Sequence, residues 1–159
     1  CVTGVQTCAL PDLRRAFLTS AATSTLALTA FAAAAGAPVV LCRLDALRVA
    51  EPLATTLPDG TPVAVVRLGA ACTGGVGPDG DVVAFVPICT HLGCAVAWTG
   101  GRFVCPCNRS QFDASLGGQC FQGPASAALP RLRLRIDGDD VVTTGIEGVV
   151  WSHPTAEPA

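Results

Sequence analysis

The sequence predicts an all-β domain that is preceded by one apolar N-terminal helix. Two observations support this prediction. Residues 16–42 contain no charged side chain, and beyond Arg43 short β-branched runs alternate with turns rich in Gly, Pro and Asp. The chain has 159 residues, half of them hydrophobic, so it has room for one ordinary domain with a buried core and a short extra segment.

The first eleven residues are expected to lie outside the fold. Residues 2–11 look like the translated text of a sequencing-library adapter, so we assign residues 1–11 no structure and no function. This assignment removes Cys1 and Cys8 from the set of cysteines that could carry chemistry.

Residues 12–42 have the features of an export signal or a membrane anchor. Arg14 and Arg15 precede Phe17 and Leu18, an arrangement that resembles a twin-arginine signal, the route of proteins that cross the membrane already folded around a cofactor. The uncharged stretch that follows is also long enough to span a bilayer, because about 20 apolar residues suffice. We therefore expect a signal or anchor helix, cleaved or retained, and a location on the exported face of a bacterial cytoplasmic membrane.

The β domain is expected over residues 44–145, with a tail over residues 146–159. Turns such as Pro58-Asp59-Gly60 separate the expected strands. Arginine alternates with Leu or Ile over residues 131–136, so one face of that strand should be buried and its arginine face solvated. The runs expected as strands are 47–50, 62–68, 82–86, 102–104, 132–136 and 141–144.

Charge and cysteine content narrow the function. The net charge is -2 and charged residues make up 14% of the chain, so a nucleic-acid surface, which needs clustered Lys and Arg, is not expected. Nine cysteines in a chain of this length indicate disulfides, a metal site or redox chemistry.

Two short segments concentrate the chemistry. A Cys-x-His pair places a thiolate and an imidazole on one tight loop, and a Cys-x-Cys segment can do much the same on a second loop, so the two loops can face each other over a metal. Structural zinc sites favour two to four residues between paired ligands and fit these spacings poorly. A framework of disulfides alone leaves the histidine unexplained. The segments are Cys89-Thr90-His91-Leu92-Gly93-Cys94 and Cys105-Pro106-Cys107-Asn108-Arg109-Ser110.

These segments resemble the two cluster loops of Rieske iron-sulfur proteins, Cys-x-His-x-Gly-Cys and Cys-x-Cys-His-x-Ser, at seven of the eight defining positions. The resemblance implies an antiparallel β-sandwich with a small subdomain, near residues 87–125, that binds a 2Fe-2S cluster. It implies that Cys89 and Cys105 bind one iron, that His91 binds the other, and that Cys94 and Cys107 form a disulfide between the loops.

The chain departs from the family pattern at the fourth ligand. Asn108 stands where the family has its second histidine, and a neutral carboxamide is a poor donor to ferric iron. We therefore expect the outer iron to keep one strong protein ligand and to recruit water, and the cluster to be labile, spectrally altered or absent.

Residues around the loops extend the resemblance. Ser110 matches the serine that donates to a bridging sulfide in high-potential members, whereas Phe112 stands where those members often have tyrosine. Gly123 and Pro124 resemble the proline loop that covers the cluster from a third side. The missing tyrosine hydroxyl predicts a midpoint potential below the highest members of the family.

The resemblance implies an electron carrier rather than a stand-alone catalyst. The leading expectation is the iron-sulfur subunit of a membrane quinol:cytochrome c oxidoreductase, with cytochrome b and cytochrome c subunits and quinol as partners. One alternative is the small Rieske subunit of an arsenite oxidase, and another is a cluster-deficient, non-redox module, which Asn108 favours. A soluble ferredoxin fits less well, because Cys94 and Cys107 would have no use in a reducing cytosol.

Overall fold

A computed structural model describes residues 37–151 of the chain. The adapter-like residues, the export signal with Arg14 and Arg15, and the end of the tail lie outside the described residues. Over residues 37–151 the structure contains ten strands and one short 3₁₀ helix, so the all-β prediction is confirmed for this range. The same range contains no helix that is long and apolar enough to cross a membrane.

Six strands form the larger antiparallel sheet, in the order β1-β10-β9-β4-β3-β2. The first and last strands of the described chain therefore pair with each other, and β4 and β9 are neighbours although 45 residues separate their facing ends. The 3₁₀ helix η2 (Leu44–Ala46) follows the first strand. The strands are β1 (Val39–Arg43), β2 (Pro52–Thr56), β3 (Pro62–Arg67), β4 (Val82–Phe85), β9 (Arg131–Asp137) and β10 (Asp140–Glu147).

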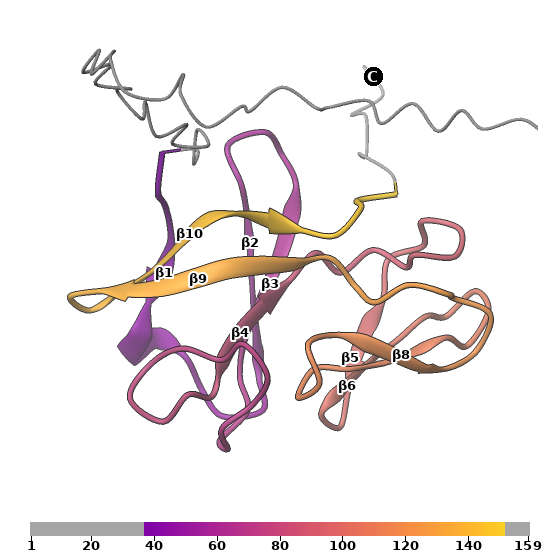
Figure 1. The fold of residues 1–159 in the computed structure, drawn as a ribbon, viewed down its shortest axis with the longest axis horizontal. Helices are drawn as coiled ribbons and strands as arrows, with labels where there is room; N and C mark the ends of the chain where they lie inside the picture. Colours follow the sequence, from indigo (N-terminus) through magenta and orange to yellow (C-terminus); the bar gives the residue numbers. More distant parts are fainter. Residues whose placement is uncertain (1–36, 152–159) are drawn as a thin grey trace, which may run out of the picture. The chain divides into compact units, whose positions relative to one another are not determined.

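The smaller sheet is built from the chain between β4 and β9. Its four antiparallel strands follow sequence order, and Figure 1 shows this sheet beside the larger one. The two segments singled out in the sequence are the loops that precede β5 and connect β6 to β7. The strands are β5 (Ala97–Thr99), β6 (Arg102–Val104), β7 (Gln111–Asp113) and β8 (Gln119–Gln122).

Five of the six expected runs contain strands, and residues 47–50 do not form one. Leu47 closes the 3₁₀ helix by a backbone hydrogen bond to Leu44, and Val49 makes only an isolated bridge to Arg67. Residues 39–42, which we expected to end the anchor segment, instead belong to β1 and pair with β10. The stretch is apolar because Leu41 packs in the core, with 7% of its surface exposed.

The alternation predicted along β9 is confirmed. Leu132 is buried, whereas Arg133 and Arg135 are exposed. Arg131 is half-buried, and its Nε donates to Glu147 of β10 at 2.7 Å. The arginine face is therefore mainly solvated, as expected of a strand with one face on the core.

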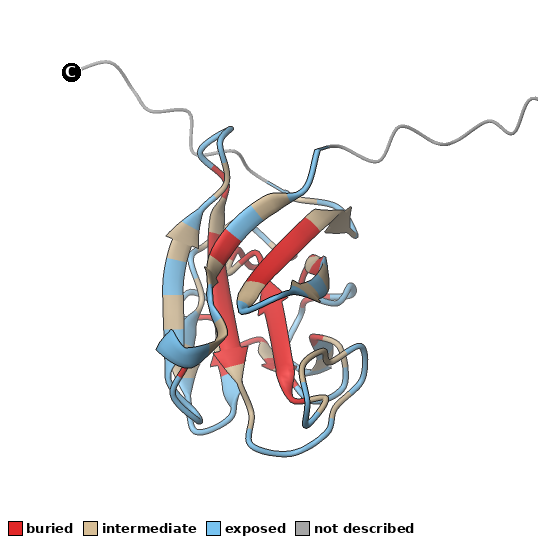
Figure 2. Cartoon of the chain, turned by 90° about the vertical axis from the view of Figure 1, so that its left-hand side faces the viewer, coloured by how far each residue is buried: buried red, intermediate tan, exposed pale blue. Residues whose placement is uncertain are grey.

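Two cores lie on opposite faces of β3 and β4, because successive side chains of a strand point to opposite faces. Val63 and Val65 contact the core that also contains side chains of β1, β9 and β10. Val66 and Phe85 contact the second core, which joins the larger sheet to the smaller one. Figure 2 shows the buried strand segments at the centre of the domain. The second core also contains Cys89 and Cys105, so the loop bases are anchored in it.

Candidate metal centre

The two loops share one backbone pattern. In the first, the Cys89 N–H donates to the Cys94 carbonyl at 2.7 Å and the Gly93 N–H donates to the Cys89 carbonyl at 2.9 Å. In the second, the Cys105 N–H donates to the Ser110 carbonyl at 2.8 Å and the Arg109 N–H donates to the Cys105 carbonyl at 2.9 Å. The fifth residue of each loop has a positive φ, +76° at Gly93 and +59° at Arg109. The loops are therefore equivalent tight turns, each starting from a buried cysteine.

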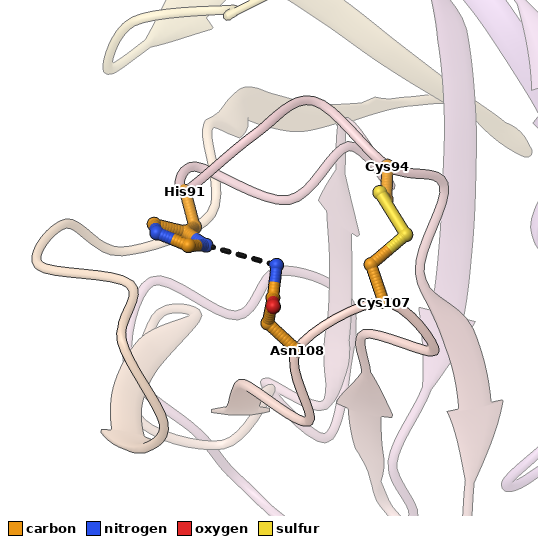
Figure 3. The surroundings of a disulfide bond; sticks show 4 residues. All are labelled: His91, Cys94, Cys107 and Asn108. Atoms are coloured by element: carbon orange, nitrogen blue, oxygen red, sulfur yellow. Dashed lines mark hydrogen bonds between the residues drawn. A yellow bond between two sulfur atoms is a disulfide. The ribbon is translucent and has the colours of Figure 1, made fainter.

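A disulfide joins the loops. Cys94, at the end of the first loop, is bonded to Cys107, in the middle of the second, with their Cα atoms 6.6 Å apart (Figure 3). This is the pair that the family resemblance implied. The bond fixes the two turns against each other on the side away from His91 and Asn108.

The first cysteines of the two loops are adjacent free thiols in the core. Cys89 and Cys105 are each 1% exposed. Burial raises the pKa of the Cys89 thiol above its ordinary value, and the nearby Cys105 thiol acts in the same direction. Two buried thiols in one core, one from each loop and shielded from water, form a suitable pair of sulfur ligands for one iron.

The other pair of expected ligands faces each other nearer the surface. The Asn108 Nδ2 lies 3.1 Å from the His91 Nδ1, and since an amide nitrogen can only donate, the imidazole Nδ1 accepts (Figure 3). His91 is half-buried and Asn108 is exposed. The two thiols therefore lie at the buried base of the loops, and the imidazole and carboxamide lie at their more accessible end.

A third segment, residues 123–129, contacts both loops. The Ala125 N–H donates to the Ser110 Oγ at 3.2 Å. Gly123 packs so closely that a Cβ there would lie 2.5 Å from the Ser110 Cα. On the first loop, the Thr90 hydroxyl donates to the Ala127 carbonyl at 2.7 Å. This segment, which includes the exposed Pro124, occupies the place expected of the proline loop.

Ser110 and Phe112 are both fully buried beside the sulfur pair, with Phe112 in the core that holds Cys89 and Cys105. Because the Ser110 Oγ accepts from Ala125, its own proton is available to a group between the loops. Phe112 offers no hydroxyl, so the donor expected of a tyrosine is missing at this position.

Three sulfur atoms, those of Cys94, Cys105 and Cys107, lie within 4.8 Å of one another. Two of them share the disulfide, so this group offers one thiol and is not a three-cysteine metal site. The structure thus argues against structural zinc in the same place, because zinc is almost always held by four protein ligands in such sites.

Comparison with known proteins identifies the fold family. A family model described as the Rieske [2Fe-2S] domain matches residues 37–133. The chain belongs to this family. Its larger sheet, smaller sheet and paired loops constitute the all-β Rieske fold, an electron-transfer domain.

Relatives fall into several kinds of Rieske protein. The chain is 35% identical over 122 residues to the iodate reductase subunit IdrB of Denitromonas iodatirespirans, covering 72% of this chain and 65% of that protein. It is 44% identical over 61 residues to the cytochrome bc1 complex Rieske iron-sulfur subunit of Corynebacterium diphtheriae, covering 36% of this chain and 15% of that protein. The chain thus spans less than two thirds of the length of either curated relative.

A solved structure supports the same family. The plasma membrane Rieske protein of Synechocystis PCC 6803 is 31% identical and superposes with a TM-score of 0.54, covering 67% of this chain and 99% of that one.

The donor set fits a Rieske cluster at three positions and departs from it at one. Rieske centres have two cysteines on one iron and two histidines on the other, and when bound the cluster takes up and releases one electron. Cys89, Cys105 and His91 have the required chemistry and placement. The chain has two histidines, and His91 is the only one within residues 37–151. The fourth position is therefore taken by the Asn108 carboxamide in the described part of the chain.

Some positioning residues were not predicted from the sequence. Thr90, whose hydroxyl ties the first loop to Ala127, was given no role from the sequence, whereas Ala125 was included in the expected proline loop but without its contact with Ser110. The positive φ of Arg109 was also missed, although its offset from Cys105 equals that of Gly93 from Cys89, which is a detectable signal.

Proposed function

We propose that this chain carries one electron at a time between a donor and an acceptor, as a subunit of a larger oxidoreductase complex. The observation that supports this most directly is the pair of adjacent buried thiols, Cys89 and Cys105, behind a surface-facing His91. These three residues would hold a 2Fe-2S cluster.

Each residue of the site has a role in this function. Cys89 and Cys105 would hold the inner iron as thiolates and would keep it away from water, since both are 1% exposed. His91, which is half-buried, would hold the outer iron and leave a ring edge near the surface. Leu92, beside it, is 68% exposed, so an apolar contact with a partner can form next to this edge.

The potential is expected to lie below that of the highest-potential Rieske proteins. The Ser110 hydroxyl can donate to a cluster sulfur and so stabilise the reduced state, but Phe112 supplies no second hydroxyl. A redox titration of the Asn108→His protein tests this point without the altered ligand. A midpoint equal to that of the highest members would contradict it.

Two kinds of complex remain as candidates for the partner. The match to the iodate reductase subunit extends over 72% of the chain, which favours a complex of that kind. The matches to cytochrome b6-f and bc1 subunits are shorter, at 34–42% of the chain, but reach 41–45% identity, and these favour the quinol:cytochrome c oxidoreductase. The arsenite oxidase alternative stays a prediction.

We place the domain on the exported face of the membrane. The disulfide between Cys94 and Cys107 supports this location, because disulfides persist in oxidising compartments. The Arg14-Arg15 pair would supply the export route, and the segment after it would anchor the domain or be removed.

Reconstitution with iron and sulfide tests the cofactor. The natural chain, Asn108→His and Cys89→Ser are compared by iron and sulfide content, visible absorption and EPR. We expect two irons per chain in Asn108→His, fewer and more labile irons in the natural chain, and no Rieske signal in Cys89→Ser. Iron in Asn108→His but none in the natural chain would instead support the cluster-deficient module. Equal and normal Rieske spectra in both would show that Asn108 is harmless.

Purification of the complex from the source cells tests the partner. Co-purification with b-type haem supports the quinol:cytochrome c oxidoreductase, and co-purification with iodate-reducing activity supports the iodate reductase kind. Recovery of the chain alone, with a cluster but without either partner after mild extraction, would contradict membership of both complexes.

A further inference from the structure

Three sulfur atoms lie close together between the two loops. The Sγ atoms of Cys94, Cys105 and Cys107 are all within 4.8 Å of one another. Cys94 and Cys107 form the disulfide (Figure 3), whereas Cys105 is a free thiol. A free thiol beside a disulfide is the arrangement required for thiol–disulfide exchange, in which a thiolate attacks one sulfur of the bond and the other sulfur leaves.

A second buried thiol allows a further exchange. Cys89 and Cys105 are each 1% exposed and belong to the same core, where the two thiols lie near each other. The disulfide lies closer to the surface, since Cys107 is exposed and Cys94 is half-buried. Exposed disulfides are the labile ones, because a thiol has access to them. A bond between Cys89 and Cys105 would therefore be the better protected of the two.

The departure from the family's donor set gives this exchange its opportunity. The Asn108 carboxamide does not fit the position of the fourth ligand, and its amide nitrogen donates to the His91 Nδ1 instead. In the chain without a cluster, Cys89 and Cys105 are free thiols. Their sulfur atoms are then available to react with the neighbouring disulfide.

We infer that the disulfide of the cluster-free chain migrates from the surface pair to the buried pair, Cys89 and Cys105, and leaves a dithiol at the surface. In the first step the Cys105 sulfur bonds to Cys94, the bond between Cys94 and Cys107 breaks, and Cys107 leaves with the electron pair and takes up the proton that Cys105 lost. In the second step Cys89 bonds to Cys105, and Cys94 leaves as a thiol in the same way. One disulfide and two thiols are present before and after, so no oxidant or reductant is needed.

The first attack is favoured at Cys94 rather than at Cys107. A bond between Cys105 and Cys107 would close a ring across a single intervening residue, whereas a bond between Cys105 and Cys94 joins the two loops as the present disulfide does. Cys107 is also exposed, so water can hydrate the thiolate that leaves, and a hydrated thiolate is the better leaving group. The completed exchange withdraws both buried sulfur atoms from the metal centre.

The test is disulfide mapping of the full chain, purified without a cluster and incubated under argon without a reductant. Samples are stopped with acid, alkylated in denaturant, reduced, alkylated again with an isotopically distinct reagent and mapped by mass spectrometry. We expect the free-thiol label to increase with time on Cys94 and Cys107 and to decrease on Cys89 and Cys105. Cys105→Ser should keep the original bond, because it lacks the attacking sulfur. Cys120→Ser is the matched control and should behave as the natural chain, because Cys120 is a free, half-buried thiol outside the group.

The outcomes separate this inference from the proposed function. An unchanged bond between Cys94 and Cys107 in the natural chain, or the same loss of that bond in Cys105→Ser, would overturn the inference. A final bond to Cys120, or to a second copy of the chain, would also overturn it. Exchange in a chain that takes up no iron on reconstitution would support the inference and overturn the electron carrier.

Discussion

The contact between Gly123 and Ser110 holds residues 123–129 against the second cluster loop, and Gly123→Ala tests it. A Cβ at position 123 would lie 2.5 Å from the Ser110 Cα and 2.8 Å from its backbone nitrogen. Both atoms are backbone, so they cannot swing away as a flexible side chain would. Gly123 also has a φ of +94°, which side chains disfavour.

Gly123→Ala is expected to lower the free energy of unfolding for two reasons. The left-handed backbone costs about 1–2 kcal/mol for a residue with a Cβ. Overpacking against Ser110 adds about 1–3 kcal/mol. Gly60→Ala is the matched control, because Gly60 has a φ of +84° but nothing within 4 Å of its added Cβ. Gly60→Ala should therefore show the backbone cost alone.

Urea unfolding of both variants, with the disulfide intact, measures the difference. We expect Gly123→Ala to lose about 1–3 kcal/mol more than Gly60→Ala, because overpacking is the only part that they do not share. The same variant should alter the EPR of the loaded Asn108→His protein, because Ser110 must shift. Equal costs for the two alanine variants would refute the reasoning.

Two further predictions concern stability. Replacing both Cys94 and Cys107 by Ala removes a disulfide with a sequence separation of 13. In the chain-entropy model this lowers the free energy of unfolding by about 3 kcal/mol. A loss below about 1 kcal/mol would contradict this prediction. Arg67→Leu removes the ion pair of the Asp81 carboxylate, whose side chain is 2% exposed. This substitution should lower the free energy of unfolding by about 3 kcal/mol. The control is Asp79→Asn, because Asp79 pairs with the same arginine at the surface. It should lower the free energy of unfolding, measured by urea, by less than about 1 kcal/mol. Equal losses for the two variants would be inconsistent with a buried charge at Asp81.

The sequence predicted strands best where β-branched residues form a run of their own. β3, β4 and β10 are such runs, and β9 has clear period-two alternation. β1 was missed because its residues continue the apolar N-terminal stretch without a break. β5 and β7, with three residues each, were not among the expected runs, although the equally short β6 was.

The sequence indicated the chemistry of the candidate ligands but not the contacts that hold the two loops in place. The resemblance of the two loop segments to the Rieske motifs is what implied Cys89, His91 and Cys105 as ligands, since spacing alone left zinc and disulfides as alternatives. The contact of Thr90 with Ala127 joins residues 37 apart, so it depends on how the loops are placed by the sheets. The same holds for the 3.1 Å contact between His91 and Asn108, which no local pattern encodes.

Pulsed EPR of the reduced natural chain, labelled with ¹⁵N-histidine and measured without added imidazole, tests the central claim most directly. The account predicts one strongly coupled histidine nitrogen, from His91, and two in Asn108→His. No coupled histidine nitrogen, or two in the natural chain, would contradict an iron-sulfur cluster held by Cys89, Cys105 and a single histidine.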